Sequence, residues 1–247
     1  TENYLIVFLK YPEPGKVKTR LSKSIGSENA VELYRLFVES ILEQTSDQIE
    51  NAQNKIDSCR KTNKKRYETL LFFTPEEKKT DIRAWLGNDH NYYLQKGKDL
   101  GERMSNAFKA ACDLGAKKVI IIGSDTPTLG KTLILKAFEM LNQNDAVIGP
   151  TKDGGYYLLG LSFITDTFTK LNASLIFSDI EWSSSNVYSQ TMAKLNQINL
   201  SCKQLPEFYD IDNFEDLYSL KQDISHMNTE KLQHLRKIGD MLVKLLK

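Results

Sequence analysis

Short, continuous runs of apolar residues alternate with helical patterns along much of this chain. A continuous apolar run of strand length is typical of a strand that is buried on both faces of a sheet. Such runs predict strands at Tyr4–Leu9, Leu70–Thr74, Val119–Gly123, Asp145–Gly149 and Tyr156–Leu161. The alternation of strands and helices predicts an α/β fold in one domain, with a mostly parallel central sheet flanked by helices.

The predicted helices carry apolar residues at a spacing of three to four. They are Ser27–Gln44, with Ser27 as N-cap, Asp99–Gly115, which Gly115 ends, and Leu133–Asn142. The stretch Thr229–Lys247 is also amphipathic, so it packs on the domain's own surface or forms the face of a homodimer. We therefore predict one domain over residues 1–220 and a helical extension packed on it over residues 221–247.

Composition excludes several classes of protein. The 247 residues hold 33 basic and 32 acidic side chains, a net charge of +1 that argues against a nucleic-acid polymer as partner. No apolar run approaches the roughly 20 residues of a membrane span, and the first residues resemble a strand rather than a signal peptide. Three widely separated cysteines fit a reducing, cytoplasmic location (Cys59, Cys112, Cys202).

A polar insert at residues 47–68 interrupts the pattern and holds six basic residues (Lys55, Arg60, Lys61, Lys64, Lys65, Arg66). We interpret it as a solvated helix end and loop. A site for a phosphate group or an acidic partner is the alternative.

A basic loop, KYPEPGKVKTRL at residues 10–21, follows the first predicted strand directly. Ligands of open parallel sheets bind beyond the carboxyl ends of the strands, and lysine and arginine suit a polyphosphate. A Pro-Gly turn also lets the backbone approach a ligand. A solvated basic loop is the alternative; Walker A and GxGxxG motifs are absent. The candidate nucleotide-binding residues are Lys10, Gly15, Lys16, Lys18, Thr19 and Arg20.

Candidate metal-binding carboxylates lie in two segments. Asp125, in Gly123–Pro127, comes at the end of a predicted strand, where it can hold Mg²⁺ or Mn²⁺ or form a turn. Asp210 and Asp212 are two residues apart, so on a strand they would point the same way. Alternatively, Asp212 or Asn213 caps the helix that follows.

Two further turns are candidates for substrate binding. The Asp153–Gly155 turn separates two predicted strands and is either a plain hairpin turn or a place where substrate approaches the backbone. Trp182–Ser185 is a turn with hydroxyl groups. The candidate residues are Asp153, Gly154, Gly155, Tyr156, Trp182 and Ser183.

Six stretches together resemble a bacterial family of radical-SAM/selenodomain-associated transferases. They are LIVFLKYPEPGKVKTRL, QKGKDLGERMSNAF, VIIIGSDTPTL, IGPTKDGGYYLLGL, IEWSSSNVYSQT and FYDIDNFEDL, and they span about residues 4–217. The resemblance implies a GT-A-like, nucleotide-diphospho-sugar transferase fold. Some members of that family are labelled glycosyltransferases of arsenosugar biosynthesis.

The resemblance also implies roles for individual residues. Lys18 and Arg20 would meet nucleotide phosphates, and Asp125 would take the place of the metal-binding aspartate, so these three are the expected catalytic residues. Asp210 or Asp212 would supply a second carboxylate. Gly97 and Ser124 lie in matching stretches and join the nucleotide-binding candidates. The usual Asp-x-Asp motif is reduced here to one carboxylate.

These observations predict a transferase that uses a divalent metal, a nucleotide-activated donor and a small-molecule acceptor. The favoured reaction is glycosyl transfer from an NDP-sugar. Nucleotidyl transfer from an NTP, with release of pyrophosphate, is the alternative, because the basic loop resembles the triphosphate-binding loop of nucleotidyltransferases. A catalytically idle nucleotide-binding protein is the alternative from another class.

Overall fold

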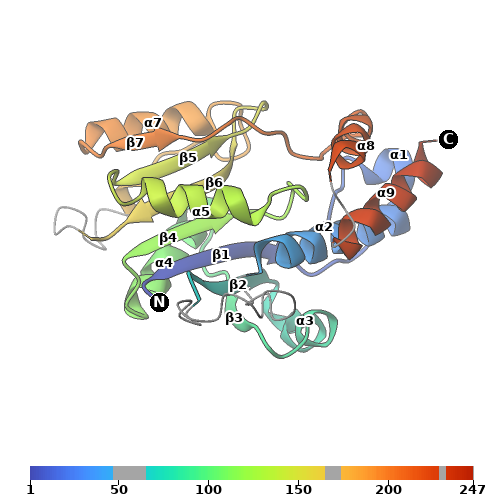
Figure 1. The fold of residues 1–247 in the computed structure, drawn as a ribbon, viewed down its shortest axis with the longest axis horizontal. Coiled ribbons are helices and arrows are strands. Elements are labelled where there is room, and N and C mark those ends of the chain that lie inside the picture. Colours follow the sequence, from blue (N-terminus) through green and yellow to red (C-terminus); the bar gives the residue numbers. More distant parts are fainter. Residues whose placement is uncertain (47–64, 165–173, 228–231, 247) are drawn as a thin grey trace, which may run out of the picture.

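A seven-stranded sheet forms the centre of the computed structural model, which describes residues 1–46, 65–164, 174–227 and 232–246 (Figure 1). The strand order is β3-β2-β1-β4-β6-β5-β7. Only β6 runs antiparallel to its neighbours, β4 and β5, so the sheet is mostly parallel, as predicted. The strands are β1 (Asn3–Lys10), β2 (Glu68–Thr74), β3 (Asn91–Leu94), β4 (Lys118–Ile122), β5 (Ala146–Pro150), β6 (Tyr156–Ser162) and β7 (Cys202–Gln204).

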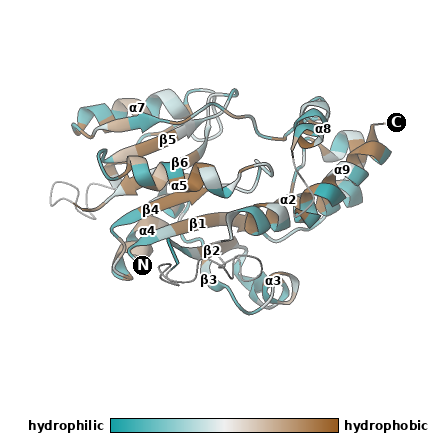
Figure 2. Cartoon of the chain, viewed as in Figure 1, coloured by the Kyte–Doolittle hydropathy of each residue, from teal (hydrophilic) through white to brown (hydrophobic). Residues whose placement is uncertain are grey.

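Helices cover both faces of this sheet, and Figure 2 shows the apolar strands between more polar helices. The helices are α1 (Ser22–Ile25), α2 (Ser27–Thr45), α3 (Lys79–Leu86), α4 (Leu100–Asp113), α5 (Lys131–Met140), α7 (Val187–Gln197), α8 (Asp216–His226) and α9 (Gln233–Leu245). Residues of α2, α3 and α5 share one hydrophobic core with the sheet. Residues of α4 and α7 form a second core on the other face.

Strand β1 shows why the continuous apolar runs predict this arrangement. Its side chains alternate between the two cores: Leu5 and Val7 belong to the first, and Ile6 and Phe8 to the second. Successive side chains of a strand point to opposite faces, so a strand between two helical layers must be apolar throughout.

The five predicted strands and three predicted internal helices are confirmed, with ends that differ by a few residues. The N-cap prediction was wrong: Gly26 occupies that position, and Ser27 is the first residue of α2. Strands β3 and β7 and helix α7 escaped prediction because they are short or half polar. Residues 47–64 of the polar insert and residues 229–231 lie outside the described residues.

A third hydrophobic core joins α1, α2, α8 and α9 at one end of the molecule (Figure 1). The apolar residues of α9 that sequence periodicity singles out are buried there, among them Leu235, Ile238 and Leu242. Glu43 of α2 accepts hydrogen bonds from the first backbone N–H groups of α9. The boundary expected after residue 220 falls inside α8. Within the described part of the chain, no helix combines the length and apolar character needed to cross a membrane.

Candidate functional site

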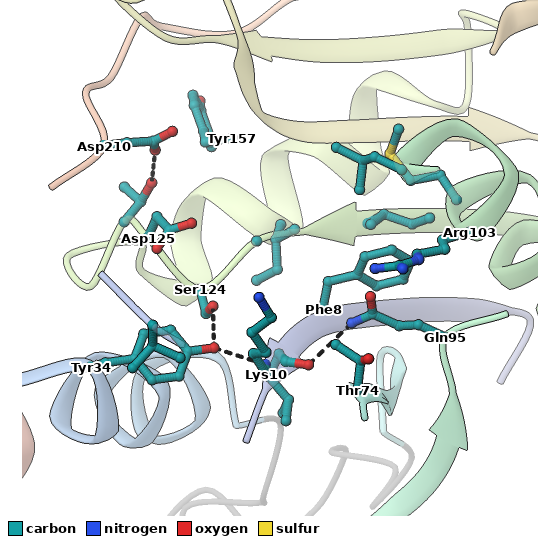
Figure 3. A pocket seen from close by; sticks show the side chains of 18 of the residues that line it. Phe8, Lys10, Tyr34, Thr74, Gln95, Arg103, Ser124, Asp125, Tyr157 and Asp210 are labelled. Carbon is teal, nitrogen blue, oxygen red and sulfur yellow. Dashed lines mark hydrogen bonds between the residues drawn. The ribbon is translucent and has the colours of Figure 1, made fainter. Parts of the chain in front are cut away.

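A cavity of about 420 Å³ opens beyond the carboxyl ends of β1 and β4 (Figure 3). Its lining brings together predicted site residues from four separate parts of the sequence (Lys10, Lys16, Lys18, Ser124, Asp125, Tyr156, Asp210). Parallel strands carry their carboxyl ends to one edge of a sheet, which is why loops far apart in sequence meet here. The cavity therefore combines cationic side chains with carboxylates.

Lys18 holds a buried ammonium at this cavity, with only 3% of its side chain exposed. Its Nζ lies 2.5 Å from Oδ1 of Asp125 and 3.4 Å from Oδ1 of Asp212, and it donates a hydrogen bond to the carbonyl oxygen of Ile211 at 2.7 Å. Burial alone would lower the Lys18 pKa, but the charges of Asp125 and Asp212 raise it above its ordinary value. Lys18 therefore stays charged at neutral pH.

Asp210 faces the same cavity and is the most perturbed acid of the site. Burial, followed by the charge of Asp125, raises the pKa of its carboxyl to about 7, although Lys18 and a hydrogen bond from Thr126 favour the charged form. Thr126 Oγ1 lies 3.1 Å from Asp210 Oδ1. Asp210 is therefore poised between its neutral and charged forms near neutral pH.

Helix α2 fixes the loop that carries Asp125. The Tyr34 hydroxyl lies 3.1 Å from Ser124 Oγ and accepts a hydrogen bond from the backbone N–H of Lys10, so one buried atom links the ends of β1 and β4 (Figure 3). Ser40 and Gln44 both donate to the carbonyl oxygen of Pro127. Burial, followed by the charge of Asp125, raises the pKa of Tyr34, which therefore remains a neutral phenol.

Gln95 and Arg103 line the cavity but escaped prediction. The Gln95 side-chain amide donates to the carbonyl oxygens of Leu9 and Phe72, which fixes its orientation. Arg103 Nε donates to the carbonyl oxygen of Gly97, so the predicted Gly97 supports a cavity residue without lining the cavity itself. Both residues belong to the stretch QKGKDLGERMSNAF, so the family resemblance of that stretch was the sequence signal that could have identified them.

Several predicted residues lie beside the cavity rather than in its lining. Arg20 is 76% exposed, and its Nη1 lies 3.6 Å from Asp212. Gly15 and Thr19 are exposed in the same loop. Asn213 accepts a hydrogen bond from the backbone N–H of Asp216, whose carboxylate accepts from Asp212 and Asn213 in return. Asn213 thus accepts from the first backbone N–H of α8, but the N-cap position itself belongs to Glu215, so neither Asp212 nor Asn213 occupies the predicted position.

The Asp153–Gly155 segment is the hairpin turn between β5 and β6. The carboxylate of Asp153 accepts hydrogen bonds from Thr151 and from the backbone of Gly155. Gly154 has φ +88°, and a Cβ there would collide with the backbone oxygen of Ser185, so the chain itself makes the close approach. The three residues of the turn do not line the cavity, whereas Tyr156, which follows the turn, does.

Trp182 packs against the start of α4, because a Cβ on Gly101 would lie 2.7 Å from its ring. Residues of that helix line the cavity, among them Arg103 and Met104. Trp182 therefore contacts a helix of the cavity wall but does not line the cavity itself. Ser183 has φ +73° and follows Trp182 in the same turn.

The carboxylate oxygens of the site fit a divalent metal that is bound together with phosphate groups. Among the described residues, no group of three or more His, Cys, Asp or Glu side chains could hold a metal ion. Mg²⁺ in nucleotide enzymes, however, usually takes one or two carboxylates together with phosphate oxygens. Asp125 and Asp210 supply that number, and a cation would relieve the mutual repulsion that contributes to the raised pKa of Asp210.

The model of one protein family matches residues 57–184, just over half of the chain, and its description is "Uncharacterized protein conserved in bacteria (DUF2064)". The chain belongs to the DUF2064 family. A candidate nucleotide-diphospho-sugar transferase from Desulfovibrio desulfuricans G20 is 33% identical, with 99% of this chain and 98% of that one covered and a TM-score of 0.82. This DUF2064 protein therefore has the nucleotide-diphospho-sugar transferase fold.

Two further solved structures share the fold at low identity. A cytidylyltransferase from Leptospira borgpetersenii is 13% identical, with 98% of this chain and 94% of that one covered and a TM-score of 0.52. The 4-diphosphocytidyl-2C-methyl-D-erythritol synthase from Anaerococcus prevotii is 14% identical, with coverages of 87% and 92% and a TM-score of 0.51. A comparison with curated protein sequences finds no match.

Proposed function

We propose that this DUF2064 protein is a transferase that uses a nucleotide-activated donor, and that it transfers a glycosyl group from an NDP-sugar to a small-molecule acceptor. One observation carries the proposal: the basic loop after β1 and the carboxylates Asp125 and Asp210 line a single cavity. Cations suit the diphosphate of such a donor, and two carboxylates suit its metal. The 33% identical relative is a candidate for the same class of enzyme.

Five charged residues of the cavity then have roles. Lys10, Lys16 and Arg103 bind the phosphates, while Asp125 and Asp210 hold Mg²⁺ or Mn²⁺. The metal, when bound, supplies positive charge to the diphosphate leaving group. In the transfer, the oxygen of an acceptor hydroxyl forms a bond to the anomeric carbon and its proton passes to solvent, while the bond to the diphosphate breaks and the nucleoside diphosphate leaves with the electron pair.

Nucleotidyl transfer is the second candidate. Lys10, Lys16 and Lys18 bring three cations from one loop to the cavity, which suits the triphosphate of an NTP. In that reaction an acceptor attacks the α-phosphorus and pyrophosphate leaves. The association with radical-SAM and selenium chemistry remains a prediction from the family resemblance.

The product that leaves distinguishes the two reactions. The protein is incubated with Mn²⁺ and either NDP-sugars or NTPs, together with cell extract as a source of acceptor. Release of a nucleoside diphosphate from an NDP-sugar supports glycosyl transfer. Pyrophosphate release from an NTP, without any nucleoside diphosphate from NDP-sugars, overturns it in favour of nucleotidyl transfer, and binding without turnover indicates an idle nucleotide-binding protein.

Calorimetry with UDP, GDP and CDP in the presence of Mn²⁺ tests the assigned metal ligand. Asp125→Ala is expected to reduce nucleotide affinity about tenfold or more. Asp240→Ala is the matched control, because Asp240 is exposed on α9 and does not line the cavity. An unchanged affinity for the Asp125→Ala protein would show that Asp125 holds no metal for the nucleotide.

A further inference from the structure

The Lys18 ammonium lies among oxygen atoms where a metal ion at Asp125 would also have to lie. Its three oxygen neighbours are Oδ1 of Asp125, Oδ1 of Asp212 and the carbonyl oxygen of Ile211, at 2.5, 3.4 and 2.7 Å. The Lys18 backbone has φ +45°, a left-handed conformation that is uncommon for a lysine. A backbone in a sparsely populated conformation persists where the surrounding contacts hold it, and such residues gather at functional sites.

We propose that Lys18 is an internal counter-cation, which keeps divalent metal away from Asp125 until a nucleotide diphosphate enters the cavity. The proposal rests on the proposed function, since it concerns the same donor and metal. A metal at Asp125 would lie within a few ångströms of the ammonium, and like charges at that distance repel strongly. Only 3% of the Lys18 side chain is exposed, which reduces the screening of its charge by water, whereas 45% of the Asp125 side chain is exposed.

An entering diphosphate removes this conflict. Its oxygens offer the ammonium new anionic partners and offer the metal new ligands, so Lys18 can turn from Asp125 to phosphate while the metal takes its place. Asp212 remains beside Arg20 when Lys18 leaves it, because Arg20 Nη1 lies 3.6 Å from the second carboxylate oxygen of Asp212. Metal and nucleotide should therefore bind cooperatively, and each should raise the affinity of the other by the same factor.

Lys16 provides a matched comparison in the same loop. It lines the same cavity and carries the same charge, but it is exposed and, in the part of the chain that the structure describes, forms no ion pair with a carboxylate. Lys16→Met and Lys18→Met thus remove the same charge from one loop. Only Lys18→Met removes the ammonium that pairs with Asp125.

Binding of Mn²⁺ alone, followed through the electron paramagnetic resonance signal of free Mn²⁺, tests the proposal without any catalytic turnover. Lys18→Met is expected to bind Mn²⁺ about tenfold or more tightly than wild type, because the competing charge is gone. Lys16→Met should bind Mn²⁺ like wild type. Both variants should bind UDP, GDP, CDP and ADP more weakly. An Mn²⁺ affinity of Lys18→Met equal to or below that of wild type would overturn the proposal.

A second measurement uses the wild-type protein only, so it stands even where Lys18→Met does not fold. The Mn²⁺ affinity is measured without nucleotide and with each diphosphate at saturation, and about a tenfold increase with at least one of them is expected. An equal affinity in every case, despite measurable nucleotide binding, would overturn the counter-cation role. If no diphosphate binds, the proposed function fails, and the Mn²⁺ affinities of Lys18→Met and wild type still decide the counter-cation role separately.

Discussion

The cavity holds cations in two different states. Lys18 is buried and compensated by Asp125 and Asp212. Lys10, Lys16 and Arg103 line the same cavity but have no acidic partner among the described residues, and Lys10 and Arg103 instead donate to backbone carbonyl oxygens. A compensated charge contributes to the folded structure, whereas an uncompensated cation is available to an anionic ligand. Stability and ligand binding should therefore respond to different residues of one cavity.

Asp125→Asn should have the largest effect on stability. It removes the nearest partner of a buried ammonium, which leaves Lys18 with Asp212 and one carbonyl oxygen. We expect the free energy of unfolding, measured by urea denaturation, to fall by about 2–3 kcal/mol, less than for a fully buried pair because Asp125 is 45% exposed. Asp240→Asn, on the exposed face of α9, should change it by less than about 0.5 kcal/mol. Equal losses in both variants would contradict the role of the pair.

Asp210 should make stability depend on pH. Its pKa of about 7 in the folded protein lies above the ordinary 3.8, so between these values the folded chain binds more protons than the unfolded chain. The free energy of unfolding therefore falls as pH rises through this window. Asp210→Asn cannot ionise, so from about pH 5 to about pH 6.5 it should gain on the order of 1–2 kcal/mol relative to wild type. A pH-independent difference between the two proteins would show that burial does not perturb Asp210.

The difference between the compensated and the uncompensated cations also explains what the sequence could predict. Lys10, Lys16, Lys18 and Asp125 follow strands that are apolar throughout, so the strand-end rule places them at one edge of the sheet. The compensation of Lys18 depends on the Ile211 region, 193 residues away along the chain, and no local pattern reveals such a pairing.

Two other parts of the site were hidden for local reasons. Arg103 and Tyr34 lie within amphipathic helices, where the sequence pattern separates buried from exposed faces but does not show which residue reaches a cavity. Gln95 follows β3, a four-residue strand too short and too polar to predict. The fold was thus more predictable than the site. Buried residues recur at regular intervals along the sequence, whereas contacts between distant loops leave no such pattern.

Tyr34→Phe tests the link between the ends of β1 and β4 at the cavity. It removes the hydroxyl that accepts from the Lys10 backbone at 2.8 Å and contacts Ser124 at 3.1 Å. We expect a loss of about 1 kcal/mol in the free energy of unfolding, since a part-buried backbone N–H loses its acceptor. Tyr218→Phe is the control, because Tyr218 is 56% exposed on α8. A thermal midpoint equal to that of the control protein would show that the hydroxyl does not hold the two loops together.

Arg20→Met should have the smallest effect on stability. Arg20 is 76% exposed, and its distance of 3.6 Å to Asp212 describes a surface ion pair, so we expect a change of less than about 0.5 kcal/mol. Its effect on the affinity for nucleoside diphosphates should also be smaller than that of Lys16→Met, because Lys16 lines the cavity and Arg20 does not. Calorimetry on the two variants decides the matter. An equal loss of affinity would mean that the loop turns Arg20 toward the phosphates on binding, and the sequence-based role of Arg20 would then hold for the bound state.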